Sequence, residues 1–333
     1  MLVLIVLLVI FGLAVLFSSS EYNGRVRFGD SACYFKKQLF ATALGMGVMY
    51  MVSSIDYHFF LRLGPVAYLI SMFLSGAVLF VGQEINGSKR WLNLGPLSFQ
   101  PSEFAKVAVI LFLAWQIERT KKATRGFGFM CRTILTLLPI IGLVGSNNLS
   151  TAIIVMAITV LLLFLVHPKT KRFVVFACVV LVLAVIVVVY LKIQISDMAT
   201  STDFRMRRII AWLNPEANSD KDSYQFLQGL YAIGSGGFFG KGLGNSTQKL
   251  SAIPEAQNDM IFAIICEELG LVGAIIMFLM FGYLLYQMFI VVRESKNLYG
   301  SVVVIGVMLH IIFQIIVNVC VAVNFFPNTG VSL

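Results

Sequence analysis

Asp259 is the residue whose type and position best suit general-base chemistry in this chain. It lies in the run Pro254-Glu255-Ala256-Gln257-Asn258-Asp259-Met260, where a long polar stretch meets an apolar one. A carboxylate at the mouth of a helical bundle removes a proton from a hydroxyl that approaches within about 3 Å. An aspartate before an apolar run is also a common helix N-cap, so the spacing alone leaves both interpretations open.

Two further carboxylates, Glu267 and Glu268, follow two helical turns later on the same predicted helix. At 3.6 residues per turn, Glu267 lies about 80° round the axis from Asp259 and would face the same cavity. Adjacent carboxylates at membrane depth cannot both face hydrocarbon, so at least one must face protein or water. We therefore consider Glu267 as a substrate-binding residue, with a buried structural pair as the alternative.

The segment Gln100-Pro101-Ser102-Glu103-Phe104-Ala105-Lys106 is the second polar group. Pro101 and Ser102 predict a helix start with Ser102 as the N-cap. Glu103 and Lys106 are three residues apart, which places them on adjacent turns of one face. The pattern fits either a cationic floor under an anionic head group or a capped helix with a local ion pair.

Arg90 and Trp91, just upstream, add a possible phosphate contact and an anchor at the membrane interface. The three histidines, His58, His167 and His310, are far apart in the sequence, so it predicts no metal site.

These residues must be positioned by membrane helices. The chain has 333 residues, is 59% hydrophobic and 12% charged, and has a mean hydropathy of +0.89. Such a composition excludes a soluble enzyme, a disordered protein and a nucleic-acid-binding domain. Spans of about 20 apolar residues predict an all-α, polytopic helix bundle. The expected helices are 1–18, 38–54, 64–82, 103–117, 132–146, 150–166, 172–192, 259–292 and 300–323.

The whole chain, 1–333, is expected to form one integral membrane domain with two prominent outer loops, at about 83–102 and 193–258. One set of loops carries eleven Lys and Arg against seven in the opposite set. The positive-inside rule then predicts a cytoplasmic N-terminus. Within the second loop, 205–213 predicts a short amphipathic helix, and the Gly-rich stretch 234–244 predicts a flexible turn rather than a phosphate-binding loop.

At these residues the sequence resembles the SEDS proteins (shape, elongation, division and sporulation), and within them the FtsW/SpoVE branch more than RodA. The matching stretches are NGSKRWLNLGPLSFQPSEFAK at 86–106, YQFLQGLYAIGSGGFFGKGLGNSTQK at 224–249 and IPEAQNDMIFAIICEELGLVG at 253–273. The tail at 325–333, FFPNTGVSL, matches the start of a fourth motif.

The resemblance implies a ten-helix protein of the bacterial cytoplasmic membrane that polymerises lipid II into glycan strands on the outer face. It also implies work with a class B penicillin-binding protein and with other division or elongation proteins. The family's essential aspartate corresponds to Asp259. Its QPSE…K motif falls on Gln100, Pro101, Ser102, Glu103 and Lys106.

The sequence departs from the family pattern at two places. Where the family has QPDLGTA, this chain reads Ser146 to Ala152 as SNNLSTA, so Asn148 replaces the aspartate. Family members also continue past the position of Leu333 with a PFISYGG-like run and a tenth helix, so we expect a C-terminally truncated chain.

The mechanism that we expect is glycosyl transfer with inversion, in which Asp259 deprotonates the acceptor's sugar 4-hydroxyl. Lys106 and Arg90 would hold the diphosphate leaving group, and a divalent cation such as Mg²⁺ or Mn²⁺ could share that work. The alternatives are a lipid II flippase, which needs a continuous polar route across the membrane, and a non-catalytic division scaffold.

Overall fold

The computed structural model describes residues 1–85, 88–94, 97–120, 127–166, 212, 221–249 and 259–327. The predicted helix 172–192, most of the predicted amphipathic helix 205–213 and the tail motif from residue 328 onward lie outside the described residues. The chain divides into two compact units, each of which is described by itself, and the expected single domain stays a prediction.

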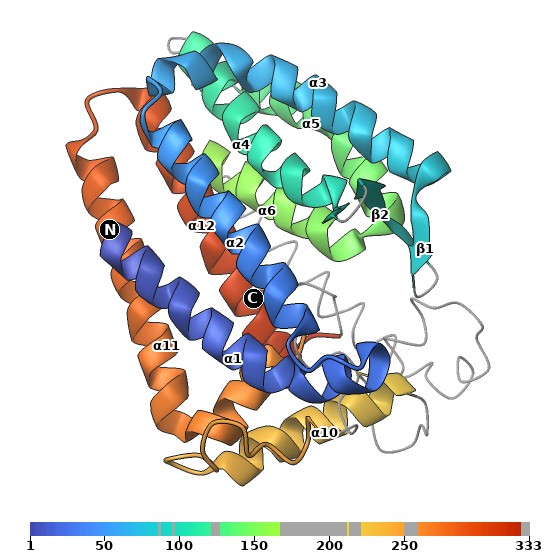
Figure 1. The fold of residues 1–333 in the computed structure, drawn as a ribbon. Coiled ribbons are helices and arrows are strands. Elements are labelled where there is room, and N and C mark those ends of the chain that lie inside the picture. Colours follow the sequence, from blue (N-terminus) through green and yellow to red (C-terminus); the bar gives the residue numbers. More distant parts are fainter. Residues whose placement is uncertain are drawn as a thin grey trace, which may run out of the picture. The chain divides into compact units, whose positions relative to one another are not determined.

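The first unit holds Met1–Ser54, Tyr190–Gln287 and Gln314–Leu333. Its helices are α1 (Leu2–Phe28), α2 (Cys33–Ser53), α10 (Lys221–Gly236), most of α11 (Ile261–Glu294) and the end of α12 (Leu298–Ala322). Figure 1 shows α10 lying across the start of α11. Buried side chains from α1, α10, α11 and α12 form its core, among them Val15, Phe226, Ala263 and Val321.

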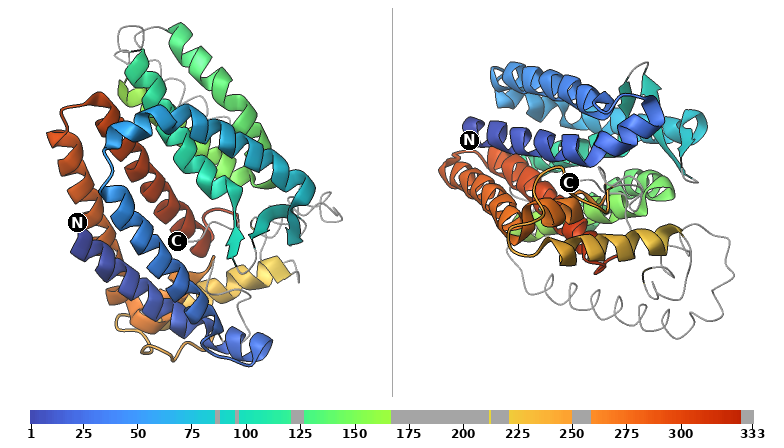
Figure 2. Two further views of the ribbon diagram at one scale, coloured as in Figure 1. Left: turned by 45° about the horizontal axis from the view of Figure 1, so that its top comes forward. Right: turned by 60° about the horizontal axis from the view of Figure 1, so that its bottom comes forward.

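The second unit holds Ile55–Val189 and Met288–Phe313. It contains α3 (Tyr57–Val81), α4 (Pro101–Arg119), α5 (Phe127–Asn147) and α6 (Leu149–Val166), with α3 and α4 side by side in Figures 1 and 2. A Cβ on Gly64 of α3 would lie 2.9 Å from the Leu111 carbonyl of α4, so only glycine permits this close approach. Tyr68 stacks on Phe112 at a centroid distance of 4.5 Å.

The polytopic helical class is confirmed. Six helices in the described part of the chain are long and apolar enough to cross a membrane: α1, α3, α5, α6, α11 and α12. Large apolar side chains such as Phe73, Phe80 and Leu279 are exposed on these helices. Such exposure is expected where lipid, rather than water, surrounds the protein.

The outer loop predicted at 83–102 contains a small antiparallel sheet that the sequence analysis missed. Its strands are β1 (Gln83–Ile85), β2 (Ser88–Leu94) and β3 (Leu97–Phe99), in the order β1-β2-β3. Leu92 pairs with Phe99 across β2 and β3. The ladder satisfies backbone N–H and C=O groups of a loop that lies next to a membrane helix.

Several helix starts and ends differ from the prediction. Helices α2, α3 and α5 begin five to seven residues earlier than predicted, at Cys33, Tyr57 and Phe127. The first helix continues beyond residue 18, because Ser18, Ser19 and Ser20 are buried against protein, and it ends at Gly29 in a left-handed conformation (φ 71°). Helix α4 begins at Pro101, with Gln100 as the N-cap residue. The prediction of Ser102 as the N-cap is therefore wrong, because proline takes the first helical position, where its missing N–H costs nothing.

The long helix predicted at 259–292 is interrupted. Gly270 has non-helical angles (φ 66°, ψ −163°), which divide α11 into a short first segment, 261–269, and a long membrane segment, 271–294. We call residues 261–269 the half-helix. The break, and not tilt alone, accommodates the unusual length of the stretch.

Candidate functional site

Asp259 lies in a turn of the first unit, two residues before α11 begins at Ile261, and its side chain is half-buried. Its backbone carbonyl accepts a hydrogen bond from Asn318 Nδ2 of α12 at 3.4 Å. Asn318 is fully buried, so α12 holds the turn through a polar group in an otherwise apolar helix. Helix α12 therefore fixes the backbone at the predicted catalytic residue.

Glu267, near the other end of the half-helix, is fully buried and saturated with hydrogen bonds. Its carboxylate accepts from Lys241 Nζ at 2.7 Å, from the Thr247 N–H at 3.1 Å and from Thr247 Oγ1 at 3.0 Å. Ser246 Oγ donates a further bond to its second oxygen. This arrangement matches the structural alternative, while a direct role of Glu267 in substrate binding stays a prediction.

Glu268 forms an ion pair with a different lysine, Lys249. Lys249 Nζ lies 2.9 Å from its Oε1 atom, with 3% and 1% of the two side chains exposed. Ser18 Oγ of α1 donates to the same carboxylate at 2.6 Å and accepts from Lys249 at 2.9 Å. Each glutamate is thus paired with a lysine from the segment 237–249, and this pairing offsets part of the desolvation penalty of burying the carboxylates.

The segment 237–249 also supplies the backbone groups that the break at Gly270 leaves without helical partners. The N–H groups of Lys241 and Gly242 donate to the carbonyls of Glu267 and Glu268, each at 2.9 Å. In return, the N–H groups of residues 271 and 272 donate to the carbonyls of residues 237 and 238, at 3.0 and 3.1 Å. The two chain segments therefore interlock at the helix break.

This interlock requires glycine. A Cβ on Gly270 would lie 2.5 Å from the Phe238 carbonyl, and one on Gly240 would overlap the Glu268 carbonyl. Gly240 and Gly270 also have positive φ angles of 76° and 66°. The predicted turn is fastened to the half-helix by backbone hydrogen bonds and by the ion pair of Lys241 with Glu267, and the pair of Lys249 with Glu268 lies just beyond it. Lys241 among the glycines, Lys249 after them and the Glu-Glu pair were the signal in the sequence.

The second unit holds the other predicted group. Lys106 Nζ lies 2.7 Å from Glu103 Oε2, which confirms the ion pair between adjacent turns of α4. The Lys106 side chain is 1% exposed, whereas that of Glu103 is 47% exposed. His310 of α12 interacts electrostatically with both residues. Sequence reasoning missed His310, because more than 200 residues separate it from the pair.

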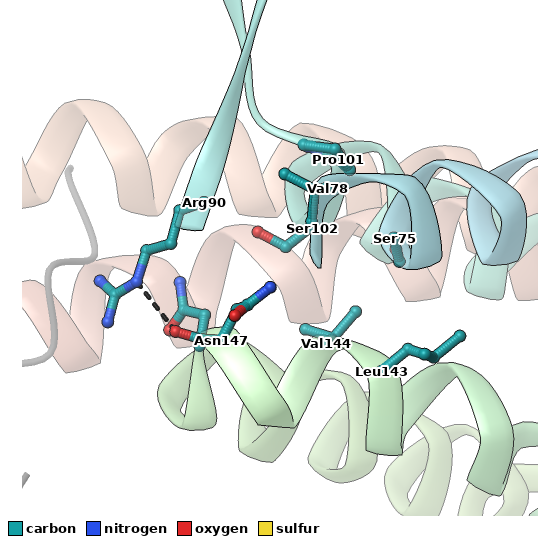
Figure 3. A pocket seen from close by; sticks show the side chains of 9 residues that line it. Ser75, Val78, Arg90, Pro101, Ser102, Leu143, Val144 and Asn147 are labelled. Carbon is teal, nitrogen blue, oxygen red and sulfur yellow. Dashed lines mark hydrogen bonds between the residues drawn. The ribbon is translucent and has the colours of Figure 1, made fainter. Parts of the chain in front are cut away.

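A small pocket next to this pair is lined by Arg90 of β2, Ser102 of α4, Ser75 of α3 and the end of α5 (Figure 3). It has room for about one water molecule. Ser102 Oγ is buried and has no hydrogen-bond partner among the described residues. As it stands, the pocket is too small to admit a sugar ring.

Arg90 reaches the carbonyl end of α5. Its Nε donates to the Asn147 carbonyl at 2.9 Å, as the dashed line in Figure 3 shows. A cation at a helix C-terminus is electrostatically favourable.

Asn148 connects α5 to α6, and its Oδ1 accepts from the Thr151 N–H at 3.3 Å. The residue that replaces the family aspartate thus caps α6 with a neutral side chain. Trp91 is half-buried on β2.

In the second unit, Arg90 and Ser102 line one small pocket, Glu103 and Lys106 form an ion pair, and Gln100 precedes the helix α4 that carries Ser102, Glu103 and Lys106. The structure places Asp259 and Glu267 at the two ends of one half-helix in the first unit. That these groups make one active site stays a prediction. No cluster of three or more His, Cys, Asp or Glu side chains that could hold a metal occurs in the described ranges.

Fold and site together define a polytopic helical membrane protein with carboxylates and cations at its helix ends and buried ion pairs at a broken helix. The FtsW/RodA/SpoVE family model, described as cell cycle protein, matches residues 1–333. The chain belongs to the FtsW/RodA/SpoVE family.

Relatives and solved structures agree with this assignment. The chain is 32% identical to stage V sporulation protein E of Bacillus subtilis, covering 99% of this chain and 88% of that protein. It is 34% identical to the probable peptidoglycan glycosyltransferase FtsW of Hydrogenovibrio crunogenus, covering 98% and 82%.

Among solved structures, a chain of a peptidoglycan synthase complex that coordinates polymerization and crosslinking is 26% identical, with a TM-score of 0.74 and coverage of 98% and 89%. The rod shape determining protein RodA of Thermus thermophilus is 24% identical, with a TM-score of 0.68 and coverage of 100% and 87%, and supports the fold alone.

Proposed function

We propose that this chain is a peptidoglycan glycosyltransferase that polymerises lipid II into glycan strands at the outer face of the bacterial cytoplasmic membrane. The observation that carries the proposal is the family match over the whole chain, combined with an aspartate held at the start of a half-helix. Relatives that match nearly the whole chain carry the glycosyltransferase name.

In the proposed reaction, the 4-hydroxyl of the acceptor sugar attacks the anomeric carbon of the donor glycan. Asp259 takes the hydroxyl proton as the new C–O bond forms. The bond between the anomeric carbon and the diphosphate-lipid breaks, and the electron pair leaves with the diphosphate. Attack opposite the leaving group inverts the configuration at that carbon.

Arg90 and Lys106 are the proposed electrostatic partners of the departing diphosphate. Gln100, Ser102, Glu103 and Trp91 belong to the same proposed binding region, and a divalent cation such as Mg²⁺ or Mn²⁺ could share the charge. Lys106 suits this role because Glu103 orients its ammonium in a site with little access to water. Low access to water strengthens such interactions.

The proposed partner is a class B penicillin-binding protein, and the proposed topology has a cytoplasmic N-terminus. The likeness to a chain of a peptidoglycan synthase complex supports the partner, and the loop charges support the topology.

The test is lipid II polymerisation by the purified chain with its penicillin-binding partner, comparing Asp259→Asn with Asp30→Asn. Asp30 is an exposed aspartate that pairs with Lys36, so it serves as the matched control. We expect Asp259→Asn to lose about 10²–10⁴-fold in rate, the usual contribution of a general base. Full polymerisation by folded Asp259→Asn protein would overturn the assignment.

The flippase alternative is separated by performing the assay in detergent, where no bilayer exists to be crossed. Strand synthesis under these conditions supports the enzyme. Absence of synthesis, together with lipid II transfer across vesicles, would favour the flippase.

A further inference from the structure

The loop of residues 237–243, which follows α10 and forms part of the interlock, carries an exposed apolar surface. Phe238 and Phe239 are 71% and 85% exposed, and Leu243 is 56% exposed. Tyr231, five residues before the end of α10, is a fourth large exposed side chain, at 59%. Exposure of large apolar side chains to water is unfavourable, and its free-energy cost grows with the apolar area exposed.

The position of the loop is set by its hydrogen bonds to α11. The carbonyls of Gly237 and Phe238 accept from the N–H groups of Leu271 and Val272. These two residues begin the long membrane segment of α11, and both are exposed, at 48% and 41%. The exposed face continues with Ile275, Ile276 and Leu279. The apolar surface of the loop therefore lies beside the exposed apolar face of a helix that is long and apolar enough to cross a membrane.

Much of the loop's backbone, and its single charge, are paired within the protein. The N–H groups of residues 240, 241 and 242 donate to the carbonyls of residues 236, 267 and 268. Lys241, the one ionisable residue among 237–243, is paired with Glu267. Irregular backbone is tolerated near hydrocarbon only when its polar groups are satisfied within the protein. The bonds made by the N–H groups of residues 240–242 and by the carbonyls of residues 237 and 238, together with the ion pair of Lys241, meet that requirement for these groups.

We propose that residues 237–243 form an anchor in the membrane interface, with Phe238, Phe239 and Leu243 inserted at the boundary between lipid headgroups and acyl chains. Aromatic side chains are enriched at this depth, and amphipathic segments bury their apolar face about 5–10 Å into it. The Gly-rich part of the long outer loop thus rests in lipid and not in water. The proposal concerns lipid contact and does not depend on the proposed glycosyltransferase activity.

The experiment places a fluorescent tryptophan at the tip of the loop. Phe239→Trp protein is reconstituted in phosphatidylcholine and phosphatidylglycerol vesicles, and its added emission over the parent protein is measured. Phosphatidylcholines brominated near the headgroup or deep in the acyl chain act as lipid quenchers, and iodide acts as the aqueous quencher. Leu279→Trp, on an exposed position of α11, is the matched control for deep lipid contact.

We expect the shallow bromines to quench Phe239→Trp more strongly than the deep ones, the reverse order for Leu279→Trp, and weak quenching of both by iodide. Strong iodide quenching without bromine quenching would place the loop in water and overturn the proposal. Resistance to all quenchers would show that protein covers the loop, and would overturn it equally. Leu243→Trp repeats the test at a second position should Phe239→Trp fail to fold.

Discussion

Lys249 Nζ lies 2.9 Å from Glu268 Oε1, and both side chains are almost entirely shielded from solvent. Removing one partner of a buried ion pair leaves the other charge uncompensated, which typically costs about 3–5 kcal/mol. We therefore expect Lys249→Met to lower the free energy of unfolding by about that amount. Denaturation of the purified protein in lipid-detergent bicelles measures the change.

The matched control for this pair is Lys36→Met, which removes the lysine of an exposed pair with Asp30 (68% and 45% exposed) and should change stability very little. The double variant Lys249→Met/Glu268→Gln should recover part of the loss, since no charge is then left buried. Equal effects of Lys249→Met and Lys36→Met would contradict the structural role.

Gly270 tests the interlock at the helix break. Alanine at this position would strain a backbone with φ 66° and place its Cβ 2.5 Å from the Phe238 carbonyl. The strained conformation alone costs about 1–3 kcal/mol, so Gly270→Ala should be clearly destabilised. Gly282→Ala is the control, because a Cβ there meets no atom within 4 Å. In a helix interior, alanine is favoured over glycine by about 0.5–1 kcal/mol. Opposite shifts in melting temperature are expected, and shifts of the same sign would contradict the geometry.

Glu103 tests the orientation of Lys106. Glu103→Gln removes the carboxylate that lies 2.7 Å from a buried ammonium, so Lys106 loses a contact that fixes its direction. If Lys106 binds the diphosphate, the apparent KM for lipid II should rise more than kcat falls. Glu294→Gln, an exposed carboxylate near the end of α11, should leave both parameters unchanged. An unaltered KM in Glu103→Gln would contradict the proposal that Lys106 binds the diphosphate of lipid II.

Asp30 provides a test of pH dependence outside the membrane segments. Hydrogen bonds from Lys36 Nζ and from the Ala32 N–H lower the pKa of its carboxyl below the usual 3.8. A lowered pKa in the folded state means that the stabilisation is fully present above the unfolded value of 3.8 and is lost as the pH falls through the folded value. The difference in melting temperature between the parent and Asp30→Asn should therefore be constant at neutral pH and shrink below about pH 3.8. A difference that persists at lower pH would contradict the assignment.

Local sequence signals predicted those features that depend on neighbouring residues. The apolar runs predicted most of the membrane helices, because each membrane-spanning segment must form the hydrogen bonds of its backbone within itself. The three-residue spacing was enough to predict the pair of Glu103 and Lys106. The same reasoning failed at Ser102, because Pro101 takes the first helical position and the N-cap residue is Gln100, two positions earlier than predicted.

The long-range relationships were decided only by the tertiary structure. Ser18, Lys249 and Glu268 meet although 231 residues separate the first two, and no periodicity in the sequence connects them. The break at Gly270 likewise arises from hydrogen bonds between residues 237–242 and 267–272. Hydrophobic patterning determines which segments enter the membrane. The partners of the buried charges, and of the backbone N–H and C=O groups at the helix break, depend on how segments distant in the chain pack together.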